Sequence, residues 1–238
     1  MSSLTIVHTN DLHGASQPLE RLAGEARSQA LLLDSGDAIA GSNTAFFLNE
    51  PNLARMSQLG YRAMAMGNRE FHYLRRVLAM RARQRNFPLL AANLVDLRGQ
   101  SEGLFQSHLS LDWQGIKVAI FGATVVQYPV GSRWERLTGF RFLAPELCLP
   151  PLVSHLRANH DLVIFLSHLG LDVDRRLAPR LEVDLVLGGH THDLLEQPEH
   201  IGKSWLFQGG SHGGYFGRIH LDLSDQLQVS YELVRCAR

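Results

Sequence analysis

The 238-residue chain lacks several features that mark particular classes of protein. Its two cysteines, Cys148 and Cys236, are too few and too far apart for a disulfide framework, which favours reduced thiols in the cytosol. No apolar run approaches the roughly 18 residues of a membrane span, and the first residues lack the pattern of a secretory signal. Lys plus Arg and Asp plus Glu both number 23, so charge does not favour a nucleic-acid polymer. The sequence therefore predicts a cytoplasmic protein without membrane or nucleic-acid partners.

Histidine, by contrast, is frequent, with 12 residues, and several histidines follow short apolar runs that are typical of strands. Seven residues of metal-binding types follow five such runs: Asp11 and His13 after LTIVH, Asp37 after ALLLD, Asn68 after YRAMAM, His168 after DLVIFLS, and His190 and His192 after VDLVLGG. Because the carboxyl ends of parallel strands lie along one edge of a sheet, we expect these side chains to converge. Two aspartates, one asparagine and four histidines suit two divalent cations better than one, since a carboxylate has two oxygens and can bridge.

Strand-like runs alternate with helical patterns, which indicates a layered α/β fold. The strands are expected near residues 4–8, 30–34, 62–66, 89–93, 116–123, 161–167, 184–188, 204–208 and 215–222. The helices are expected at residues 19–29, 44–59 with Asn43 as N-cap, 71–86, 145–159 and 171–181. A hairpin with its turn at 112–115 and a tail of consecutive strands favour a mixed sheet, or two sheets, within a single domain of residues 1–238.

The pattern resembles the calcineurin-like metallophosphoesterases and, in its context, the 5′-nucleotidase branch of that family. The matching strings cover nearly the whole chain: HTNDLHG, DSGD, GNREF, AANL, SHLG, GGHTH and QGGSHGGYFGRI. The resemblance implies a sandwich of two mixed β-sheets flanked by α-helices, with a dinuclear metal site at the strand ends. It also implies which residues hold the two ions: Asp11, His13, Asp37 and His192 for one, and Asp37, Asn68, His168 and His190 for the other.

The resemblance further implies that Asp37 bridges the ions and that a bridging hydroxide attacks phosphorus. Two dications, two aspartates and one hydroxide leave about one positive charge, which suits a phosphate anion. Imidazole and carboxylate ligands are compatible with manganese, iron, zinc or cobalt. The family favours manganese.

The sequence departs from the family motif at two positions. Arg69 stands where the family has a histidine that approaches the substrate, and His72 stands where the 5′-nucleotidase branch has an aspartate that orients this histidine. In one interpretation Arg69 binds phosphoryl oxygens, His72 supplies the proton, and esters with good leaving groups react best. In a second, the site binds metal and phosphate but turns over poorly. In a third, both side chains are structural and other groups complete the chemistry.

Substrate contacts beyond the metal ligands are expected from two further segments. The irregular segment 125–142 contains Tyr128 and Trp134, which could stack a base, and Arg133, which could reach a phosphate. The alternative is that these rings pack the segment against the protein. His212 lies where the family chain returns beside the site, and it either faces the substrate or supports the structure. The two-domain 5′-nucleotidases bind the base in a C-terminal domain, which we do not expect in this chain. Base recognition is then expected from this domain or from a partner subunit.

Together these features predict a dinuclear metal-dependent phosphoesterase that hydrolyses small phosphate esters, nucleotides first among them. Asp37, Arg69 and His72 are the expected catalytic residues. The expected substrate contacts are Asn68, Arg69, His212, Tyr128, Trp134 and Arg133. A phosphodiesterase, for example one acting on cyclic nucleotides, is the alternative enzyme, and a module that binds metal and nucleotide without turnover is the alternative outside enzymes. The sequence leaves the oligomeric state open.

Overall fold

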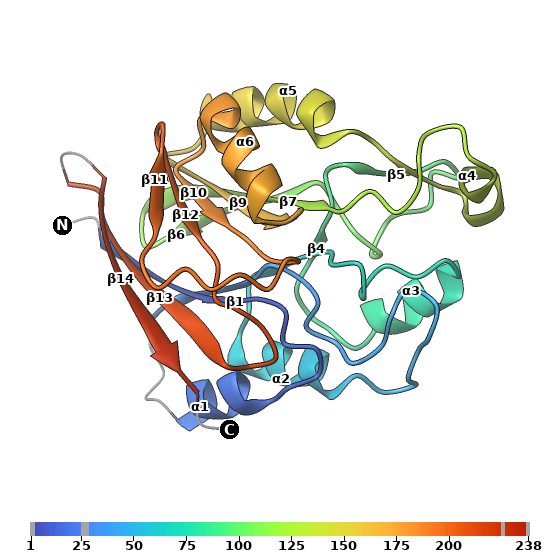
Figure 1. Cartoon of the computed structure of the whole chain (residues 1–238), viewed down its shortest axis with the longest axis horizontal. Coiled ribbons are helices and arrows are strands. Elements are labelled where there is room, and N and C mark those ends of the chain that lie inside the picture. Colours follow the sequence, from blue (N-terminus) through green and yellow to red (C-terminus); the bar gives the residue numbers. More distant parts are fainter. Residues whose placement is uncertain (1–2, 25–28, 225–226, 237–238) are drawn as a thin grey trace.

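The computed structural model describes residues 3–24, 29–224 and 227–236, and its main feature is a pair of stacked six-stranded sheets (Figure 1). The first sheet has, in spatial order, β14 (Gln228–Arg235), β13 (Tyr215–Asp222), β1 (Ser3–Thr9), β2 (Leu31–Asp34), β3 (Ala63–Ala65) and β4 (Leu89–Leu90). The strands β1 to β4 run parallel, whereas β13 and β14 are antiparallel to their neighbours. This sheet is therefore mixed, as predicted.

The second sheet is mixed as well. Its spatial order is β11 (Glu199–Ile201), β12 (Ser204–Phe207), β10 (Leu185–Leu187), β9 (Leu162–His168), β7 (Ile116–Thr124) and β6 (His108–Trp113). The four central strands are parallel, and the edge strands β11 and β6 are antiparallel. The predicted hairpin is β6–β7, in which Gln114 and Gly115 have φ values of 56° and 84°, as a tight type I′ turn requires. A small third sheet pairs β5 (Leu94–Asp96) with β8 (Phe140–Phe142).

Strand β9 shows why the sheets are layered. Successive side chains of a strand point to opposite faces. Leu162, Ile164 and Leu166 belong to the apolar layer between the two large sheets, together with residues of β1, β2 and β3. Val163 and Phe165 point the other way and pack under the helices of the second sheet. Every residue of β9 is buried, as expected for a central parallel strand with both faces covered.

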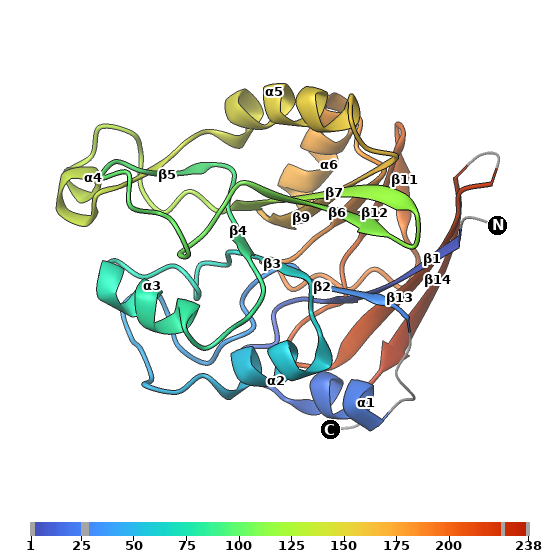
Figure 2. The same cartoon turned by 180° about the vertical axis from the view of Figure 1, so that it is seen from behind.

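Helices cover the outer face of each sheet (Figures 1 and 2). On the first sheet these are α1 (Gln17–Gly24), α2 (Pro51–Leu59) and α3 (Arg75–Ala82), and on the second α5 (Pro145–Arg157) and α6 (Leu171–Leu181). The short helix α4 (Arg133–Thr138) lies at one end of the long axis. The predicted fold class, a sandwich of two mixed sheets flanked by helices, is confirmed. Among the described residues, no helix combines the length and apolarity needed to cross a membrane.

Several predicted helix bounds were wrong. The helix expected from residue 44 begins at Pro51, because proline suits the first turn and leaves the preceding Glu50 outside the helix, so Asn43 caps nothing. The helix expected over 71–86 covers only Arg75–Ala82, because Leu74 is extended. The segment 125–142, expected to be irregular, contains α4 and β8. Of the helix expected at 19–29, residues 25–28 lie outside the described part of the chain.

Candidate metal centre

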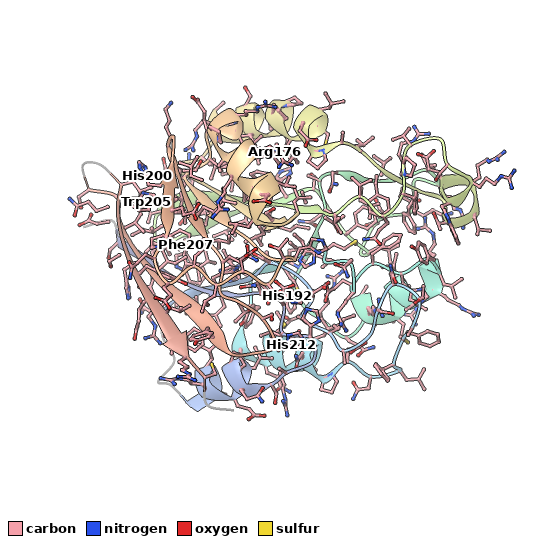
Figure 3. All side chains as sticks on the ribbon, in the orientation of Figure 1. Arg176, His192, His200, Trp205, Phe207 and His212 are labelled. Atoms are coloured by element: carbon pink, nitrogen blue, oxygen red, sulfur yellow. The ribbon has the colours of Figure 1, made fainter. Side chains whose placement is uncertain are left out.

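The seven predicted ligands meet where the carboxyl ends of strands from both large sheets come together. Asp11 and His13 follow β1, Asp37 follows β2 and Asn68 follows β3, all in the first sheet. The second sheet supplies His168 at the end of β9, and His190 and His192 after β10. Figure 3 shows His192, beside His212, near the middle of the molecule. The convergence expected from strand topology is therefore present in the structure.

Asp11, His13 and His192 form the first group of donor atoms. Oδ1 of Asp11 lies 3.6 Å from Nε2 of His13 and 3.6 Å from Nε2 of His192, and the two Nε2 atoms are 3.0 Å apart. Among the described residues, this Asp11 oxygen is buried without a hydrogen-bond partner. A buried carboxylate oxygen without a donor is costly unless a cation neutralises it. These atoms therefore fit a bound metal ion.

Asp37, Asn68, His168 and His190 form the second group. Oδ1 of Asn68 lies 3.1 Å from Nε2 of His168 and 3.1 Å from Nδ1 of His190. Oδ1 of Asp37 lies 3.5 Å from Nε2 of His168, whereas its Oδ2 lies 3.9 Å from Nε2 of His13. The two oxygens of Asp37 therefore face different histidine groups, which is the arrangement that a bridging carboxylate needs.

Ser35 orients one of these ligands. The Nδ1 atom of His168 lies 2.7 Å from the main-chain oxygen of Ser35. A carbonyl oxygen can only accept, so Nδ1 donates, and Nε2 is the nitrogen that a metal ion would bind in place of a proton. Burial lowers the pKa of His168, but the carboxylates of Asp37 and Asp11 raise it by more, to about 9. Burial raises the pKa of Asp37, but His168 lowers it by more, to below its usual range. The imidazole and the carboxyl group thus favour each other's charged form.

The backbone of the site adopts a conformation that is unusual for residues other than glycine. Among the described residues, eight that are not glycine have a positive φ, and six of them belong to this site: Asp11, His13, Asp37, His190, His192 and His212. Such conformations cost about 1–3 kcal/mol each and persist where the surrounding structure imposes them, often at functional sites. The strain is concentrated at the ligands and at His212.

Glu70 supports the site although sequence reasoning did not assign it a role. Its buried carboxylate accepts the main-chain N–H of Asp37 at 2.7 Å, of Gly67 at 3.0 Å, of Ala38 at 3.0 Å and of Ile39 at 3.3 Å. Burial and the nearby Asp37 raise its pKa. Glu70 thus joins the loop that carries Asp37 to the loop that carries Asn68. The sequence feature that could have indicated this role is the position of Glu70 in the GNREF string.

Arg69 lies beside Asp37. Its main-chain N–H donates to Oδ1 of Asp37 at 2.7 Å, and its Nε lies 3.8 Å from Oδ2 of Asp37. Its Nη1 donates to the carbonyl oxygens of Ala40 and Gly41 at 3.1 and 3.2 Å. The side chain is 30% exposed, so part of the guanidinium remains accessible. Contact of Arg69 with substrate stays a prediction.

In the described part of the chain, His72 contacts Phe46 and Leu74 rather than the predicted metal ligands. Its ring is buried against Phe46 at 5.9 Å, and its Nδ1 accepts the main-chain N–H of Leu74 at 2.9 Å. Burial and the charge of Arg81 lower its pKa. These contacts match those expected of a structural residue, and no described contact joins His72 to the metal ligands. Proton transfer by His72 stays a prediction.

His212 is next to the ligands. Its ring stacks on His13 with centroids 4.6 Å apart and meets His192 edge-on at 5.4 Å. Its main-chain N–H donates to the carbonyl oxygen of Asp11 at 2.7 Å. Asn10 holds the same returning loop, because its side chain bonds Gly209, Gly210 and Asp11. Asn10 is a second supporting residue that the sequence did not reveal.

Three predicted substrate contacts lie elsewhere. Tyr128 is buried, and its hydroxyl bonds Thr138 and the carbonyl oxygen of Phe140 at 2.7 and 2.9 Å, so the ring packs its own segment. Arg133 and Trp134 lie on α4 at one end of the molecule, away from the central His192 and His212 (Figures 1 and 3). Trp134 is half-exposed and stacks on Tyr73 at 5.1 Å. Substrate binding by these three residues stays a prediction, because their described contacts do not connect them to the predicted metal ligands.

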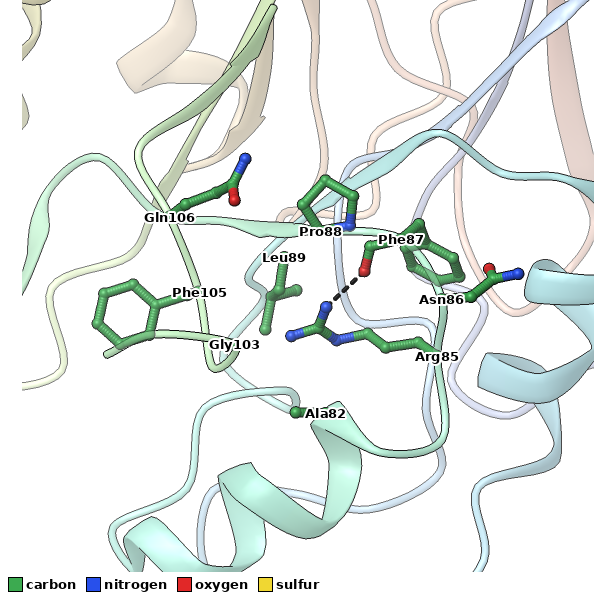
Figure 4. A pocket seen from close by; sticks show the side chains of 9 residues that line it. All are labelled: Ala82, Arg85, Asn86, Phe87, Pro88, Leu89, Gly103, Phe105 and Gln106. Carbon is green, nitrogen blue, oxygen red and sulfur yellow. Dashed lines mark hydrogen bonds between the residues drawn. The ribbon is translucent and has the colours of Figure 1, made fainter. Parts of the chain in front are cut away.

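A pocket of about 340 Å³ lies between the end of α3 and β4 (Figure 4). Arg85 crosses it, donating Nη1 to the carbonyl oxygen of Phe87 and Nη2 to that of Leu104 at 2.6 Å. Burial lowers the pKa of Arg85 to about 10. Because both terminal nitrogens bond main-chain oxygens, Arg85 ties two loops together, and the pocket needs no ligand to explain it.

Known proteins are similar to this chain in sequence and in fold. A 5′-nucleotidase of Vibrio cholerae is 28% identical, with 97% of this chain and 51% of that protein aligned. A snake venom 5′-nucleotidase of Gloydius brevicauda is 31% identical over 81% of this chain and 37% of its own length. The crystal structure of a 5′-nucleotidase precursor from Thermus thermophilus has a TM-score of 0.80 and 26% identity, covering 99% of this chain and 55% of that one.

The chain spans about half the length of the first of these curated relatives, at 51%. The relatives and the structural neighbour support the predicted 5′-nucleotidase branch. A model of the family described as calcineurin-like phosphoesterase matches residues 4–194, which include all seven ligands. With the sandwich fold and the ligands converging at its strand ends, this match shows that the chain belongs to the calcineurin-like phosphoesterase family.

Proposed function

We propose that this chain hydrolyses small phosphate esters, with nucleotides as its substrates, by means of two divalent cations. The observation that carries the proposal is the placement of Asp37, whose Oδ1 faces His168 and whose Oδ2 faces His13. One carboxylate between two donor groups is suited to join two cations. Asp11, His13, Asp37 and His192 would hold one ion, and Asp37, Asn68, His168 and His190 the other.

Two bound divalent ions would lower the pKa of water, so that it can attack phosphorus, and would offset charge on the phosphoryl group. The seven ligands include two carboxylates, Asp11 and Asp37, so two dications leave the site positive. That charge favours an anionic ester over a neutral one. Manganese is the proposed metal because the family often works with it. Imidazoles, carboxylates and an amide without thiolate are compatible with manganese, and equally with iron, zinc or cobalt.

Arg69 is proposed to bind the phosphoryl oxygens. Its Nη1 is held by two carbonyl oxygens while the guanidinium stays partly exposed beside Asp37, so other N–H groups are available to an anion. A guanidinium does not give up its proton, so Arg69 stabilises negative charge without acting as an acid. Esters with good leaving groups should therefore react fastest. His212, stacked on His13, is proposed to face the substrate, and His72 keeps its predicted role as proton donor within this proposal.

Nucleotides are proposed because the named relatives are 5′-nucleotidases. The same similarity leaves a diester substrate as the alternative enzyme activity. The binding module without turnover also has support, because Arg69, which cannot deliver a proton, lies beside the bridging aspartate. A cytoplasmic location belongs to the proposal as well, and fractionation of cells that express the tagged chain would test it.

The test uses protein stripped of metal and reloaded with manganese. Its hydrolysis of p-nitrophenyl phosphate, bis-p-nitrophenyl phosphate and adenosine monophosphate should be measured beside Asp37→Asn. We expect two manganese ions per chain, turnover of the monoesters, and loss of turnover in the variant. Turnover of the diester alone would favour the phosphodiesterase. Two bound ions with no turnover of any ester would overturn the enzyme and favour the binding module.

A further inference from the structure

The peptide groups of Ala40 and Gly41 are held from two sides. Their carbonyl oxygens accept hydrogen bonds from Nη1 of Arg69 at 3.1 and 3.2 Å. Their N–H groups donate to the carboxylate of Glu50, to Oε2 and Oε1 respectively, each at 3.1 Å. The Ala40–Gly41 segment therefore links Glu50 to the Arg69 guanidinium, although Glu50 itself has no described contact with any predicted metal ligand.

The side chain of Glu50 does not make the contact that is usual for its position before a helix. It precedes α2 at the N-cap, yet its side chain makes no capping hydrogen bond to that helix. The residue is 1% exposed, and both carboxylate oxygens are directed to the Ala40–Gly41 segment. Burial of a carboxylate is unfavourable unless hydrogen bonds compensate it. The structure thus places a buried negative charge where its main effect is to fix these two peptide groups.

Arg81 holds the adjoining chain on the other side. It is 3% exposed, and its Nη1 donates to the carbonyl oxygens of Arg69 at 2.6 Å and Glu70 at 3.0 Å. Its Nη2 donates to the carbonyl oxygens of Ser42 at 3.0 Å and Ala45 at 3.3 Å. Arg81 therefore joins the main chain of Arg69 to the loop that the Arg69 side chain contacts. The main chain and the side chain of Arg69 are thus held by one hydrogen-bond network.

Gly41 shows how closely this network packs. A Cβ added there would lie 2.5 Å from Oε1 of Glu50 and 2.6 Å from Nη2 of Arg81. No side chain fits without moving one of these two buried groups. The spacing leaves the Ala40–Gly41 carbonyl oxygens little freedom to turn away from Arg69.

We propose that Glu50 is a positioning residue for Arg69. By fixing the Ala40 and Gly41 peptides, it sets the direction of the guanidinium, and the remaining N–H groups face the place where a phosphoryl group would bind beside Asp37. A long arginine side chain loses rotamer freedom when it binds an anion, and prior orientation reduces that loss. The inference rests on the proposed function only in taking the bound anion to be phosphate.

The experiment is a double-mutant cycle of Glu50→Gln and Arg69→Met in the full chain loaded with manganese. The affinity for inorganic phosphate should be measured by calorimetry, with manganese content and thermal unfolding recorded for each variant. We expect Glu50→Gln to weaken phosphate binding about tenfold, comparable to the loss of one charged hydrogen bond. In the Arg69→Met background the same change should cost less than about twofold, because coupled residues are not additive.

Glu135→Gln is the matched control, since Glu135 on α4 is a buried carboxylate that pairs with Arg141 on β8. It should leave phosphate binding unchanged. The inference would be overturned if Glu50→Gln lowered the affinity for phosphate equally in both Arg69 backgrounds, or in neither. Loss of bound manganese in Glu50→Gln would also overturn it. If Glu50→Gln does not fold, Gly41→Ala displaces the same segment and is judged by the same criteria. Phosphate binding with this coupling but no ester hydrolysis would overturn the proposed function and leave the inference intact.

Discussion

Nδ1 of His168 lies 2.7 Å from the main-chain oxygen of Ser35, and the two residues come from different sheets. Ser35 follows β2 of the first sheet, and His168 ends β9 of the second. A carbonyl oxygen cannot donate, so the contact assigns a proton to Nδ1 and leaves Nε2 as the nitrogen that faces Asp37 and Asn68. One hydrogen bond thus joins the two sheets at the site and orients the ring of a predicted metal ligand.

The change His168→Gln should remove one of two bound manganese ions. The imidazole nitrogen is lost, and the second ion should bind about 100-fold more weakly or worse. Metal content after dialysis, measured by mass spectrometry, should fall from two ions per chain to one. His200→Gln is the control, because His200 is exposed and contacts Trp205 at 4.5 Å, away from the ligands. Retention of both ions in His168→Gln would contradict the proposed ligand set.

The change Ser35→Ala should destabilise the fold by about 1–3 kcal/mol, because it leaves buried polar groups unpaired. The Ser35 hydroxyl donates to the carbonyl oxygen of Leu187 at 2.6 Å and lies 2.9 Å from Nε2 of His8. Burial lowers the pKa of His8 to about 3, so its ring is neutral. Because the Ser35 hydroxyl gives its single proton to Leu187, Nε2 of His8 donates to the hydroxyl oxygen. Urea unfolding measures the loss. A free energy of unfolding equal to that of the wild type would show that the contact contributes nothing.

The change Asp174→Asn should stabilise the protein more at pH 8 than at pH 5. Burial raises the pKa of Asp174 from 3.8 to about 7, and its Oδ2 is buried without a hydrogen-bond partner among the described residues. Between these two values the folded chain binds a proton that the unfolded chain has released, so stability falls as pH rises towards 7. Asparagine removes this penalty, which is on the order of a few kcal/mol.

Urea unfolding of metal-free protein at several pH values measures this effect as the difference between variant and wild type. Other titrating groups cancel in that difference. Asp172→Asn on the same helix is the control, because the Asp172 side chain is 86% exposed. A difference for Asp174→Asn that does not change with pH would contradict the raised pKa.

The change Arg69→His should alter which esters react. Histidine can donate a proton to a poor leaving group. General acid catalysis of this kind raises reaction rates by roughly 10²–10⁴-fold. We expect the kcat for an alkyl phosphate to rise relative to that for p-nitrophenyl phosphate by about tenfold or more. Arg69→Lys keeps the charge without an acid of suitable pKa and should leave the ratio near that of the wild type. An unchanged ratio in Arg69→His would show that residue 69 does not limit leaving-group departure.

The convergence of the predicted metal ligands could be foreseen because each follows an apolar run that ends at the same edge of the fold, as with Asp37 after β2 and His168 at the end of β9. Helix bounds were less predictable. The pattern over 44–59 looked helical throughout, but Glu50 is buried towards Ala40 and Gly41 and Pro51 begins the helix. The supporting role of Glu70 was hidden, because three of its four main-chain N–H partners lie about 30 positions earlier in the chain.

The order of residues along the chain therefore determined a large part of this protein. The alternation of apolar runs with amphipathic segments specifies the layers of the fold. The polar residues that follow these runs specify the predicted metal ligands. Tertiary structure alone decided which residues accompany those donors. His212 stacks on His13 from about 200 positions away, and His72 turns towards Phe46. Trp134 belongs to α4, which lies at one end of the molecule (Figure 1). The physical reason is that strand ends are brought together by sheet topology, which sequence periodicity reveals, whereas loop side chains are placed by packing and hydrogen bonds between segments far apart in the chain.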